Sequence, residues 1–555
     1  MTVTLLQPSN TSSAPTRQPP DGLARLLMAV DRWGLRGLAT FTFLVGLASL
    51  WWPHGWDAGI FTWVADAIRH GGLPYRDAFD VKGPFTFYSF ALLQLVDGPG
   101  MMAVRAFDLA CMTGAAFAVA GMVGRFEVRR AGLWTAVFLL LYHYSSDFWN
   151  TAQPDAWIAA CGVFGMALLV RPDIDRRPAL ATAAALLFGM GLLQKPTYGV
   201  LLPLPALAVL LLPSRPIRQR FLLATGLSIV TLVPAAVCIA WFAWHHALRF
   251  LLEGYLTFNF EVARQLVGGV PRALILTALH STKTPLVLVI PVAVVGAFFV
   301  WSRDRRVCLL FLVWIAGAAL SLAVQRRWFD YHWFTIAWPL APIAGIGFAR
   351  ALRSERSGPA PARLIAITAL AFLTLRFTWP LQQRIREWAE YLTGTLPSQE
   401  AYIAQFAPTE SSIVLDDHAL TAWLRAHTAP DDRVFIWDSP LAYSLAPRPA
   451  PSRVGFWVPV VLADRNHRKP IPLGPIQLEM RAEFMTALDR DTKVVAVTRE
   501  AFDGREEFLR KSLPELYGEL HHKLESEWVI VDSARNYLIF RPRDDTRAST
   551  QNGTR

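Results

Sequence analysis

Long apolar runs separated by short charged segments occupy the first two thirds of the chain. Runs of roughly twenty uncharged residues match the length that a helix needs to cross the hydrocarbon core of a bilayer. The pattern predicts a polytopic α-helical membrane protein with about eleven transmembrane helices, near residues 37–52, 101–124, 131–146, 154–170, 179–193, 197–212, 221–243, 285–301, 307–324, 331–349 and 362–380.

Two shorter helices are predicted between the first two spans. Apolar residues recur at helical spacing after Asp57 until Gly71-Gly72 interrupts the pattern, which predicts an amphipathic helix: Ile60, Phe61, Val64, Ala65 and Ile68. The segment 85–96 is apolar but too short to span, so we expect an interfacial helix that Pro84 opens. The charged turn LPYRDAFDVKGP joins the two helices, and together they would form a platform at the membrane face.

The composition changes beyond Leu381 to that of a soluble protein. Helical patterns such as QQRIREWAEYL and DHALTAWLRAH alternate with the short β-like runs RVFIWD, VGFWVPVV, KVVAVT, EWVIV and NYLIF. This alternation predicts a small α/β domain, and its last two runs suit a hairpin. The predicted organisation is a disordered cytoplasmic tail (1–22), a transmembrane domain (23–380) with a first outward loop (53–100), an extracytoplasmic α/β domain (381–543) and a disordered tail (544–555).

Composition and charge support the membrane interpretation. Of 555 residues 53% are hydrophobic and only 17% are charged, whereas soluble proteins carry about a quarter charged residues. The net charge of +11 is concentrated in short loops between spans, not along one face, so we expect no nucleic-acid partner. By the positive-inside rule these loops, and with them the N-terminus, are cytoplasmic: 125–130, 171–178, 214–220, 301–306 and 350–363. The four cysteines lie in apolar runs without metal-ligand spacing.

Polar residues at the outward ends of spans are candidates for a site, although each has a structural alternative. Asp57 and Asp155 each lie near the start of a helix, where a carboxylate can simply cap the free backbone N–H groups. Lys195 lies between two apolar runs with no carboxylate nearby in the sequence. It would either bind an anion or extend its amine to the membrane interface.

The loop QRRWFDYHWF is the one strongly basic short loop on the outward side. The positive-inside rule disfavours Arg326 and Arg327 there, so we expect a compensating negative group, for which a phosphate is the natural candidate. His332 would contribute a hydrogen bond to the same site, or serve a structural role at an aromatic interface.

The residues of the first outward loop resemble a known family. WDAG, GGLPYRD and FDVKGPFTFY, followed by a bundle with basic loops and an extracytoplasmic domain, resemble a bacterial GT-C fold glycosyltransferase. The similarity is to the branch of protein mannosyltransferases, lipid A aminoarabinose transferases and lipopolysaccharide-core galacturonosyltransferases. Its members transfer a sugar from a polyprenyl phosphate to an acceptor, using an acidic residue of this loop. The mannosyltransferases carry an adjacent Asp-Glu pair where this chain has Asp57-Ala58, which argues against a protein acceptor.

The resemblance implies a role for each candidate residue. Asp57 would be the base that deprotonates the acceptor, and Asp80 or Asp155 would orient it or the sugar. Cations would neutralise the phosphate leaving group, and the residues expected to bind substrate or phosphate are Lys82, Tyr75, Lys195, Arg326, Arg327 and His332. The family mechanism is a direct displacement, so we expect inversion at the anomeric carbon. No cofactor is required; a divalent metal would suit the gathered carboxylates, but no spacing requires one.

The expected partners follow from the same resemblance. They are a polyprenyl-phosphate-linked sugar donor, a lipid-linked or polysaccharide acceptor of the cell envelope, and membrane lipid. The expected location is the bacterial inner membrane, with the C-terminal domain in the periplasm. A transporter or flippase of lipid-linked sugars is the main alternative, although the sequence shows no inverted repeat and its candidate charges gather on one face. A non-catalytic component of surface polysaccharide assembly is the second alternative.

Overall fold

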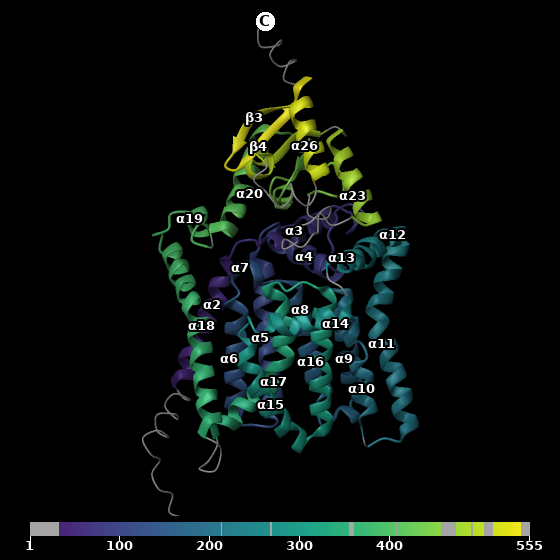
Figure 1. The fold of residues 1–555 in the computed structure, drawn as a ribbon, viewed down its shortest axis with the longest axis vertical. Coiled ribbons are helices and arrows are strands. Elements are labelled where there is room, and N and C mark those ends of the chain that lie inside the picture. The colour runs from purple at the N-terminus through teal and green to yellow at the C-terminus, as the bar shows by residue number, and fades with distance from the viewer. Residues whose placement is uncertain are drawn as a thin grey trace, which may run out of the picture.

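The structure is a computed structural model in which a long helical bundle carries a small β-sheet at one end (Figure 1). It describes residues 33–212, 214–266, 269–353, 360–406, 408–456, 473–489, 492–503 and 514–544. Both predicted disordered tails lie outside the described residues, except for Asp544. The same holds for most of the predicted run VGFWVPVV, of which only residues 454–456 are described.

Helical segments occupy all eleven ranges predicted to span the membrane. The bundle helices are α2 (Leu35–Ala48), α5 (Met102–Gly124), α6 (Arg129–Tyr144), α8 (Pro154–Leu169), α9 (Pro178–Leu192), α10 (Leu204–Leu210), α11 (Ile217–Trp244), α15 (Leu286–Arg303), α16 (Arg305–Gln325), α17 (Phe334–Arg353) and α18 (Ala360–Leu392). Among the described residues short 3-10 turns precede three of them: η3 (Ile174–Arg176) before α9, η4 (Pro196–Leu201) before α10 and η6 (Asp330–Trp333) before α17.

The predicted number of eleven transmembrane helices is not confirmed. Among the described residues six helices are long and apolar enough to cross a membrane, or seven if a pair bent by 53° at residues 52–55 counts as one. Helices α6, α8 and α9 have only 16, 16 and 15 residues, and α10 has 7. At 1.5 Å per residue, 16 residues extend about 24 Å, less than the ~30 Å of a typical hydrocarbon core. The chain therefore has a multi-pass membrane architecture in which some helices are shorter than the sequence pattern suggested.

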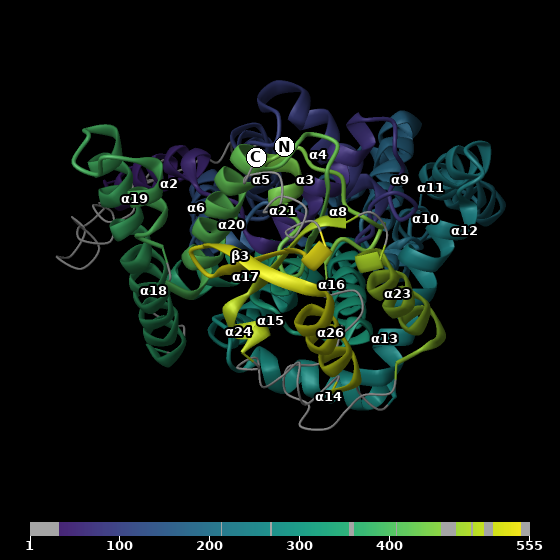
Figure 2. The same cartoon turned by 90° about the horizontal axis from the view of Figure 1, so that it is seen from above.

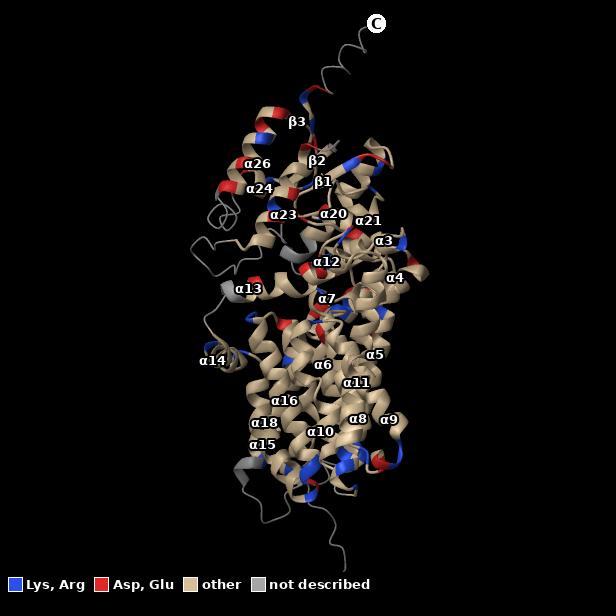
Figure 3. Cartoon of the chain, turned by 90° about the vertical axis from the view of Figure 1, so that its right-hand side faces the viewer, with Lys and Arg blue, Asp and Glu red and all other residues tan. Residues whose placement is uncertain are grey.

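The five basic loops meet at one end of the bundle, as predicted. Arg125 donates to Asp304 at 2.6 Å, and Arg350 forms an ion pair with Glu127. Ser214 donates to Asp175 at 3.1 Å, which brings two further loops together. Figure 3 shows Lys and Arg gathered at this lower end, below a bundle middle with few charged residues. We refer to it as the basic end.

The predicted platform lies across the opposite end. Helices α3 (Trp56–Arg69) and α4 (Pro84–Asp97) pack against each other between the bundle and the sheet (Figure 1). Both helices were predicted: α3 begins one residue before Asp57 and ends two residues before Gly71, and α4 extends one residue beyond each end of the segment 85–96. The remaining helices of this end are α7 (Asp147–Asn150), α12 (Leu248–Leu251), α13 (Phe258–Leu266) and α14 (Val270–Ser281).

The C-terminal part forms a four-stranded mixed sheet with helices around it, and this sheet lies above the bundle (Figure 2). The strand order is β1-β2-β4-β3, with β1 parallel to β2 and the other neighbours antiparallel. The predicted hairpin is confirmed: Ala534 pairs with Tyr537 across a two-residue turn in which Arg535 has a φ of 48°. The elements are α19 (Gln399–Ile403), α20 (Pro408–His427), β1 (Arg433–Ile436), α21 (Leu441–Leu445), α23 (Pro475–Thr486), β2 (Thr492–Thr498), α24 (Arg499–Phe502), α26 (Pro514–Glu527), β3 (Trp528–Ala534) and β4 (Tyr537–Pro542).

Candidate active site opposite the basic end of the bundle

The turn between α3 and α4 holds Lys82 by its backbone. The Tyr75 hydroxyl donates to the carbonyl of Lys82 at 2.6 Å, and the Lys82 amide donates to Asp80 at 3.2 Å. Asn259 of α13 donates to the neighbouring carbonyl of Val81 at 2.9 Å. Tyr75 has a φ of 67°, a left-handed conformation uncommon for a residue with a bulky side chain. The turn therefore fixes the direction in which Lys82 leaves the backbone.

Gly83 brings this turn against the hinge between α9 and η4. The Gly83 amide donates to the carbonyl of Gln194 at 2.9 Å, and the Phe85 amide donates to the carbonyl of Leu193 at 3.1 Å. A Cβ at position 83 would lie 2.0 Å from the Leu193 carbonyl oxygen, so only glycine permits this approach. The backbone contact places Lys82 beside the hinge that carries Lys195.

Asp57 lies in the first turn of α3 but does not cap it. The N-cap residue is Gly55, and no side chain caps this helix. The Asp57 carboxylate instead accepts a hydrogen bond from the Tyr331 hydroxyl at 2.9 Å, and its Oδ2 lies 3.6 Å from Lys82 Nζ. The Asp57 side chain is 25% exposed, whereas Asp80 and Asp155 are 6% and 0% exposed. Of these three carboxylates, Asp57 is the one that a substrate can reach.

Asp155 and Lys195 form a buried ion pair. The Lys195 ammonium contacts both carboxylate oxygens of Asp155, at 2.8 and 2.7 Å, and donates to Gln325 at 3.1 Å. No side chain caps α8, so Asp155 does not act as its cap. Lys195 is 8% exposed and its amine lies over the Tyr331 ring, so it does not extend to the membrane interface. The two residues hold η4, α8 and the end of α16 together.

A cavity of about 380 Å³ opens beside these residues. Three basic side chains line it, namely Lys82, Lys195 and Arg327. Its other walls are largely apolar and come from η4, α13 and the end of α16: Val200, Phe258, Phe260, Val262, Ala263 and Val324. Cations beside apolar walls suit an anionic group that carries a hydrocarbon tail. Asp57 does not line the cavity but lies beyond Lys82 and Tyr331, in contact with both.

The other predicted site residues take different positions. His332 lines the cavity, is buried and donates from Nδ1 to the carbonyl of Arg327 at 3.0 Å. Arg326 does not line the cavity; it has a φ of 55° and its guanidinium donates to the carbonyl of Ala263. Tyr75 is fully buried beneath the turn. Tyr75 and Arg326 thus hold the backbone around the cavity, whereas Arg327 and His332 face it.

The charges outside the spans shift one another's pKa values. Burial alone would lower the pKa of Lys82, but Asp57, Asp80 and Asp155 together raise it above its ordinary value. Burial raises the pKa of Asp80, and Lys82 opposes that shift. Burial lowers the pKa of Lys195, with Asp155 opposing. Lys82 is therefore the more strongly held positive charge of the two lysines.

Sequence reasoning missed three residues of the site: Tyr331, Gln325 and Asn259. Tyr331 donates a hydrogen bond to Asp57, which is 274 residues away in the sequence, and Asn259 donates one to Val81, which is 178 residues away. Tyr331 is adjacent to His332 in the outward loop QRRWFDYHWF, so its hydroxyl at the end of a predicted span was the available signal. Gln325 is the first residue of the same loop and adjoins Arg326, whereas no local pattern marks Asn259, which occurs within ordinary helical sequence.

A second polar cluster anchors the two segments that lead into α3 and α8. Arg105 of α5 is 1% exposed and donates to the carbonyls of Pro53 at 2.7 Å and Phe148 at 2.9 Å. It also donates to the Thr151 hydroxyl at 2.5 Å. Pro53 precedes Asp57 by four residues, and Thr151 precedes Asp155 by four. One guanidinium therefore joins the two backbone segments that carry the candidate carboxylates.

The part of the chain that the structure describes contains no group of three His, Cys, Asp or Glu side chains arranged to hold a metal ion. The acidic residues of the site face lysines and a tyrosine instead.

Comparisons with known proteins bear on the family and the fold of the chain. A family model described as dolichyl-phosphate-mannose-protein mannosyltransferase matches residues 81–244, which include Lys82, Asp155 and Lys195. No curated protein sequence matches the chain significantly.

Two crystal structures of ArnT from Cupriavidus metallidurans share the fold. The apo structure aligns with a TM-score of 0.56 and 12% identity, over 91% of this chain and 96% of that one. The structure bound to undecaprenyl phosphate aligns with a TM-score of 0.54 and 12% identity, over 91% and 97%. At this identity the likeness concerns the fold. The family model and the fold together confirm the resemblance carried by the first outward loop: the chain is similar to the GT-C fold glycosyltransferases.

Proposed function

We propose that this protein is an inverting glycosyltransferase that moves a sugar from a polyprenyl-phosphate carrier to a glycolipid or polysaccharide of the cell envelope. The observation that carries the proposal is the basic cavity: Lys82, Lys195 and Arg327 meet beside apolar walls, and Lys82 also contacts the partly exposed carboxylate of Asp57. The cavity can thus bind a phosphate with a lipid tail, and Asp57 lies next to it as the base for an acceptor. The resemblance to GT-C glycosyltransferases supports the same class.

In the proposed reaction the acceptor oxygen or nitrogen attacks the anomeric carbon of the donor. The bond from that carbon to the phosphate oxygen breaks, and the bonding electrons leave with the polyprenyl phosphate. The acceptor proton passes to Asp57, so the products are the glycosylated acceptor and the free lipid phosphate. Attack opposite the departing phosphate inverts the anomeric configuration.

Asp57 suits the role of base because of its exposure and its partners. The Tyr331 hydroxyl and the Lys82 ammonium both contact Oδ2, which leaves Oδ1 for an acceptor hydroxyl. Asp80 and Asp155 are too buried for this role. They instead bond the Lys82 amide and the Lys195 ammonium, and so position the cations.

The cations suit a leaving group that needs charge neutralisation more than protonation. Fixed positive groups stabilise the charge that develops on the phosphate without reorganisation during the reaction. Arg327 and His332 line the same cavity, so they complete the proposed phosphate site. We propose that these side chains suffice without a required cofactor; turnover in the presence of a chelator tests this.

The proposed setting is the bacterial inner membrane, with the site, the C-terminal part and the acceptor on the periplasmic side. The support is that the five basic loops gather at the end of the bundle opposite the site, and such loops favour the cytoplasm. A transporter or flippase, the alternative from the sequence, gains no support from the comparisons.

The test is sugar release from a panel of polyprenyl-phosphate sugars by the purified protein in lipid, with Asp57→Asn as the variant. The substitution keeps the shape of the side chain but removes the base, so we expect turnover to fall by roughly two to four orders of magnitude. Asp66→Asn is the matched control. Asp66 lies on the same helix, but its carboxylate pairs with Arg69 and His70, so the control should retain activity.

Two results would contradict the proposal. Equal turnover by wild type and Asp57→Asn would exclude Asp57 as the base. Absence of turnover of every donor by the folded wild-type protein would exclude the enzyme class and favour the transporter.

A further inference from the structure

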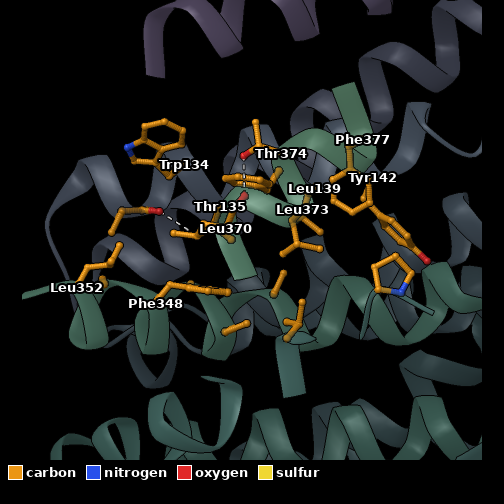
Figure 4. Close-up of a pocket in the computed structure, with 18 of the residues that line it drawn as sticks. Trp134, Thr135, Leu139, Tyr142, Phe348, Leu352, Leu370, Leu373, Thr374 and Phe377 are labelled. Atoms are coloured by element: carbon orange, nitrogen blue, oxygen red, sulfur yellow. Dashed lines mark hydrogen bonds between the residues drawn. The ribbon is translucent and has the colours of Figure 1, made fainter. Parts of the chain in front are cut away.

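A second cavity, of about 590 Å³, lies within the bundle between α6, α15, α17 and α18 (Figure 4). Trp134 and Leu352 lie at one end of the view and Tyr142 and Phe377 at the other. Along α6 the lining runs from Val128 to Tyr142, about 21 Å at 1.5 Å per residue. This exceeds the ~15 Å depth of one leaflet's hydrocarbon region, half of a typical core.

Water is an unsuitable occupant. The cavity is far larger than the ~10–15 Å³ that one water requires, but each buried water needs two to four polar partners. The lining is almost entirely apolar, and the hydroxyls of Thr135 and Thr374 already donate to Ala131 at 2.8 Å and Leu370 at 2.7 Å within their own helices. A hydrocarbon chain would restore the dispersion contacts that such walls lose when unfilled.

The end of the cavity nearer the proposed active site is closed by aromatic rings. Tyr142 packs edge-on against Phe334, with centroids 5.5 Å apart, and lies 5.7 Å from Phe377. Phe334 in turn packs on His143 at 5.1 Å. A lipid in this cavity could not present its head group to Asp57 or Lys82 past these rings, so the tails of the donor and acceptor are poor candidates.

The other end reaches the basic end of the bundle. Arg130 of α6 lines the cavity there. Arg129 of α6 and Arg350 of α17 lie close by. Arg350 is partly exposed and pairs with Glu127. A lipid whose tail fills the cavity would thus have its head group among arginines, which favour a negative charge.

We propose that this cavity binds one acyl chain of an anionic phospholipid, whose head group contacts Arg130 at the basic end. The lipid joins α18, the helix that leads to the C-terminal part, to α6, α15 and α17. The site is separate from the proposed active site and does not depend on the proposed function.

The experiment compares phosphatidylglycerol with phosphatidylcholine of the same acyl chains, added to the delipidated full-length protein in detergent. Native mass spectrometry measures retained lipid, and thermal unfolding measures stabilisation. We expect retained phosphatidylglycerol and a Tm that rises with its concentration, because a ligand of the folded state stabilises it. Phosphatidylcholine should bind more weakly.

Substitutions that fill the cavity with a large side chain test whether the lipid binds there. Ala371→Trp on α18 and Ala341→Phe on α17 place rings in the cavity from two walls, and both should abolish retention and the Tm shift. Ala240→Trp, on the exposed face of α11, is the matched control and should retain both. If one filling variant fails to fold, as judged by gel filtration, the other still decides.

Removing the positive charge of Arg130 tests whether the lipid head group binds at this end of the cavity. Arg130→Gln should weaken phosphatidylglycerol binding about fivefold. Arg218→Gln is the control, because Arg218 is an exposed arginine at the basic end, on α11, that does not line the cavity. Equal binding of both lipids by wild type would overturn the anionic preference. Binding that survives both filling variants, no binding by wild type, or displacement by polyprenyl phosphate would each overturn the proposal.

Discussion

At the scale of single residues, the site depends on what surrounds Asp57 and Lys195. The Tyr331 hydroxyl and the Lys82 ammonium contact the same oxygen of Asp57, so they fix the orientation of the carboxylate. Lys195 lies against Asp155 in a buried pair and also faces the cavity. Each of these contacts can be removed by a conservative substitution.

Tyr331→Phe removes the hydroxyl that orients Asp57 and leaves the ring in place. Hydrogen bonds to charged groups contribute about 1.5–3 kcal/mol, so we expect kcat to fall roughly ten- to a hundredfold with little change in KM for the donor. Steady-state kinetics in lipid measures both. Tyr88→Phe on α4, which removes a hydroxyl that accepts a hydrogen bond from Trp241 of α11, should have little effect. An unchanged kcat in Tyr331→Phe would show that this contact does not assist Asp57.

The lowered pKa of Lys195 predicts a pH dependence of donor binding. Burial disfavours the ammonium form, so Lys195 loses its charge at a lower pH than an ordinary lysine, whose pKa is 10.5. KM for the donor should therefore rise as the pH increases through this lowered pKa. Lys195→Arg keeps its charge throughout this range and should flatten the alkaline rise. The same alkaline profile in both proteins would assign the effect to another group.

At the scale of elements, the site depends on how the starts of α3 and α8 are held together. Both helices begin after segments without regular structure, and both carry an acidic residue in the first turn. The buried guanidinium of Arg105 bonds both of these segments. Arg105 touches no expected substrate atom, so it is a positioning residue.

Arg105→Met keeps the bulk of the side chain but leaves the Pro53 and Phe148 carbonyls without this donor. We expect kcat to fall about a hundredfold, because loss of these buried contacts loosens the segments before Asp57 and Asp155. Arg105→Lys should recover part of that loss, since it can keep one contact. Arg306→Met, which removes an arginine bonded to the Leu169 carbonyl at the basic end, is the control. A reduced Tm with unchanged kcat would assign Arg105 a structural role only.

At the scale of the whole molecule, the C-terminal part is fastened to the platform that carries the site. Trp63 of α3 packs against Tyr443 and Phe456, at 5.7 and 6.2 Å. The Arg453 carbonyl accepts from the Phe79 amide at 2.9 Å, and its guanidinium donates to the Tyr75 carbonyl at 3.3 Å. Arg453 therefore connects the C-terminal part with the turn that positions Lys82.

Arg453→Met tests this connection. The guanidinium is 7% exposed and pairs with Glu483 at 2.9 Å and Glu253 at 3.5 Å, so its removal leaves two largely buried carboxylates with less compensation. We expect a Tm lower by several degrees, faster limited proteolysis of the C-terminal part and a reduced kcat. Arg481→Met, which breaks pairs with the exposed Glu515 and Glu519, should change none of these. If the C-terminal part of Arg453→Met is cleaved at the same rate as that of the wild-type protein, Arg453 is not the connecting residue.

The sequence by itself determined the features that depend on local pattern and length. The platform helices, the final hairpin and the common end of the basic loops follow from apolar periodicity, a two-residue turn and charges between spans. Span length was harder to predict, because α8, α9 and η4 with α10 are apolar but short, and composition does not distinguish a short bundle helix from a full span.

Only the tertiary structure decided the partners within the site. From the sequence, Asp57 and Asp155 each had capping as a structural alternative, and Lys195 had no carboxylate nearby. The bundle brings Tyr331 to Asp57 across 274 positions, and Asp155 to Lys195 across 40. A carboxylate's role depends on its exposure and on the charges it meets, and both arise from packing between helices that no local pattern encodes.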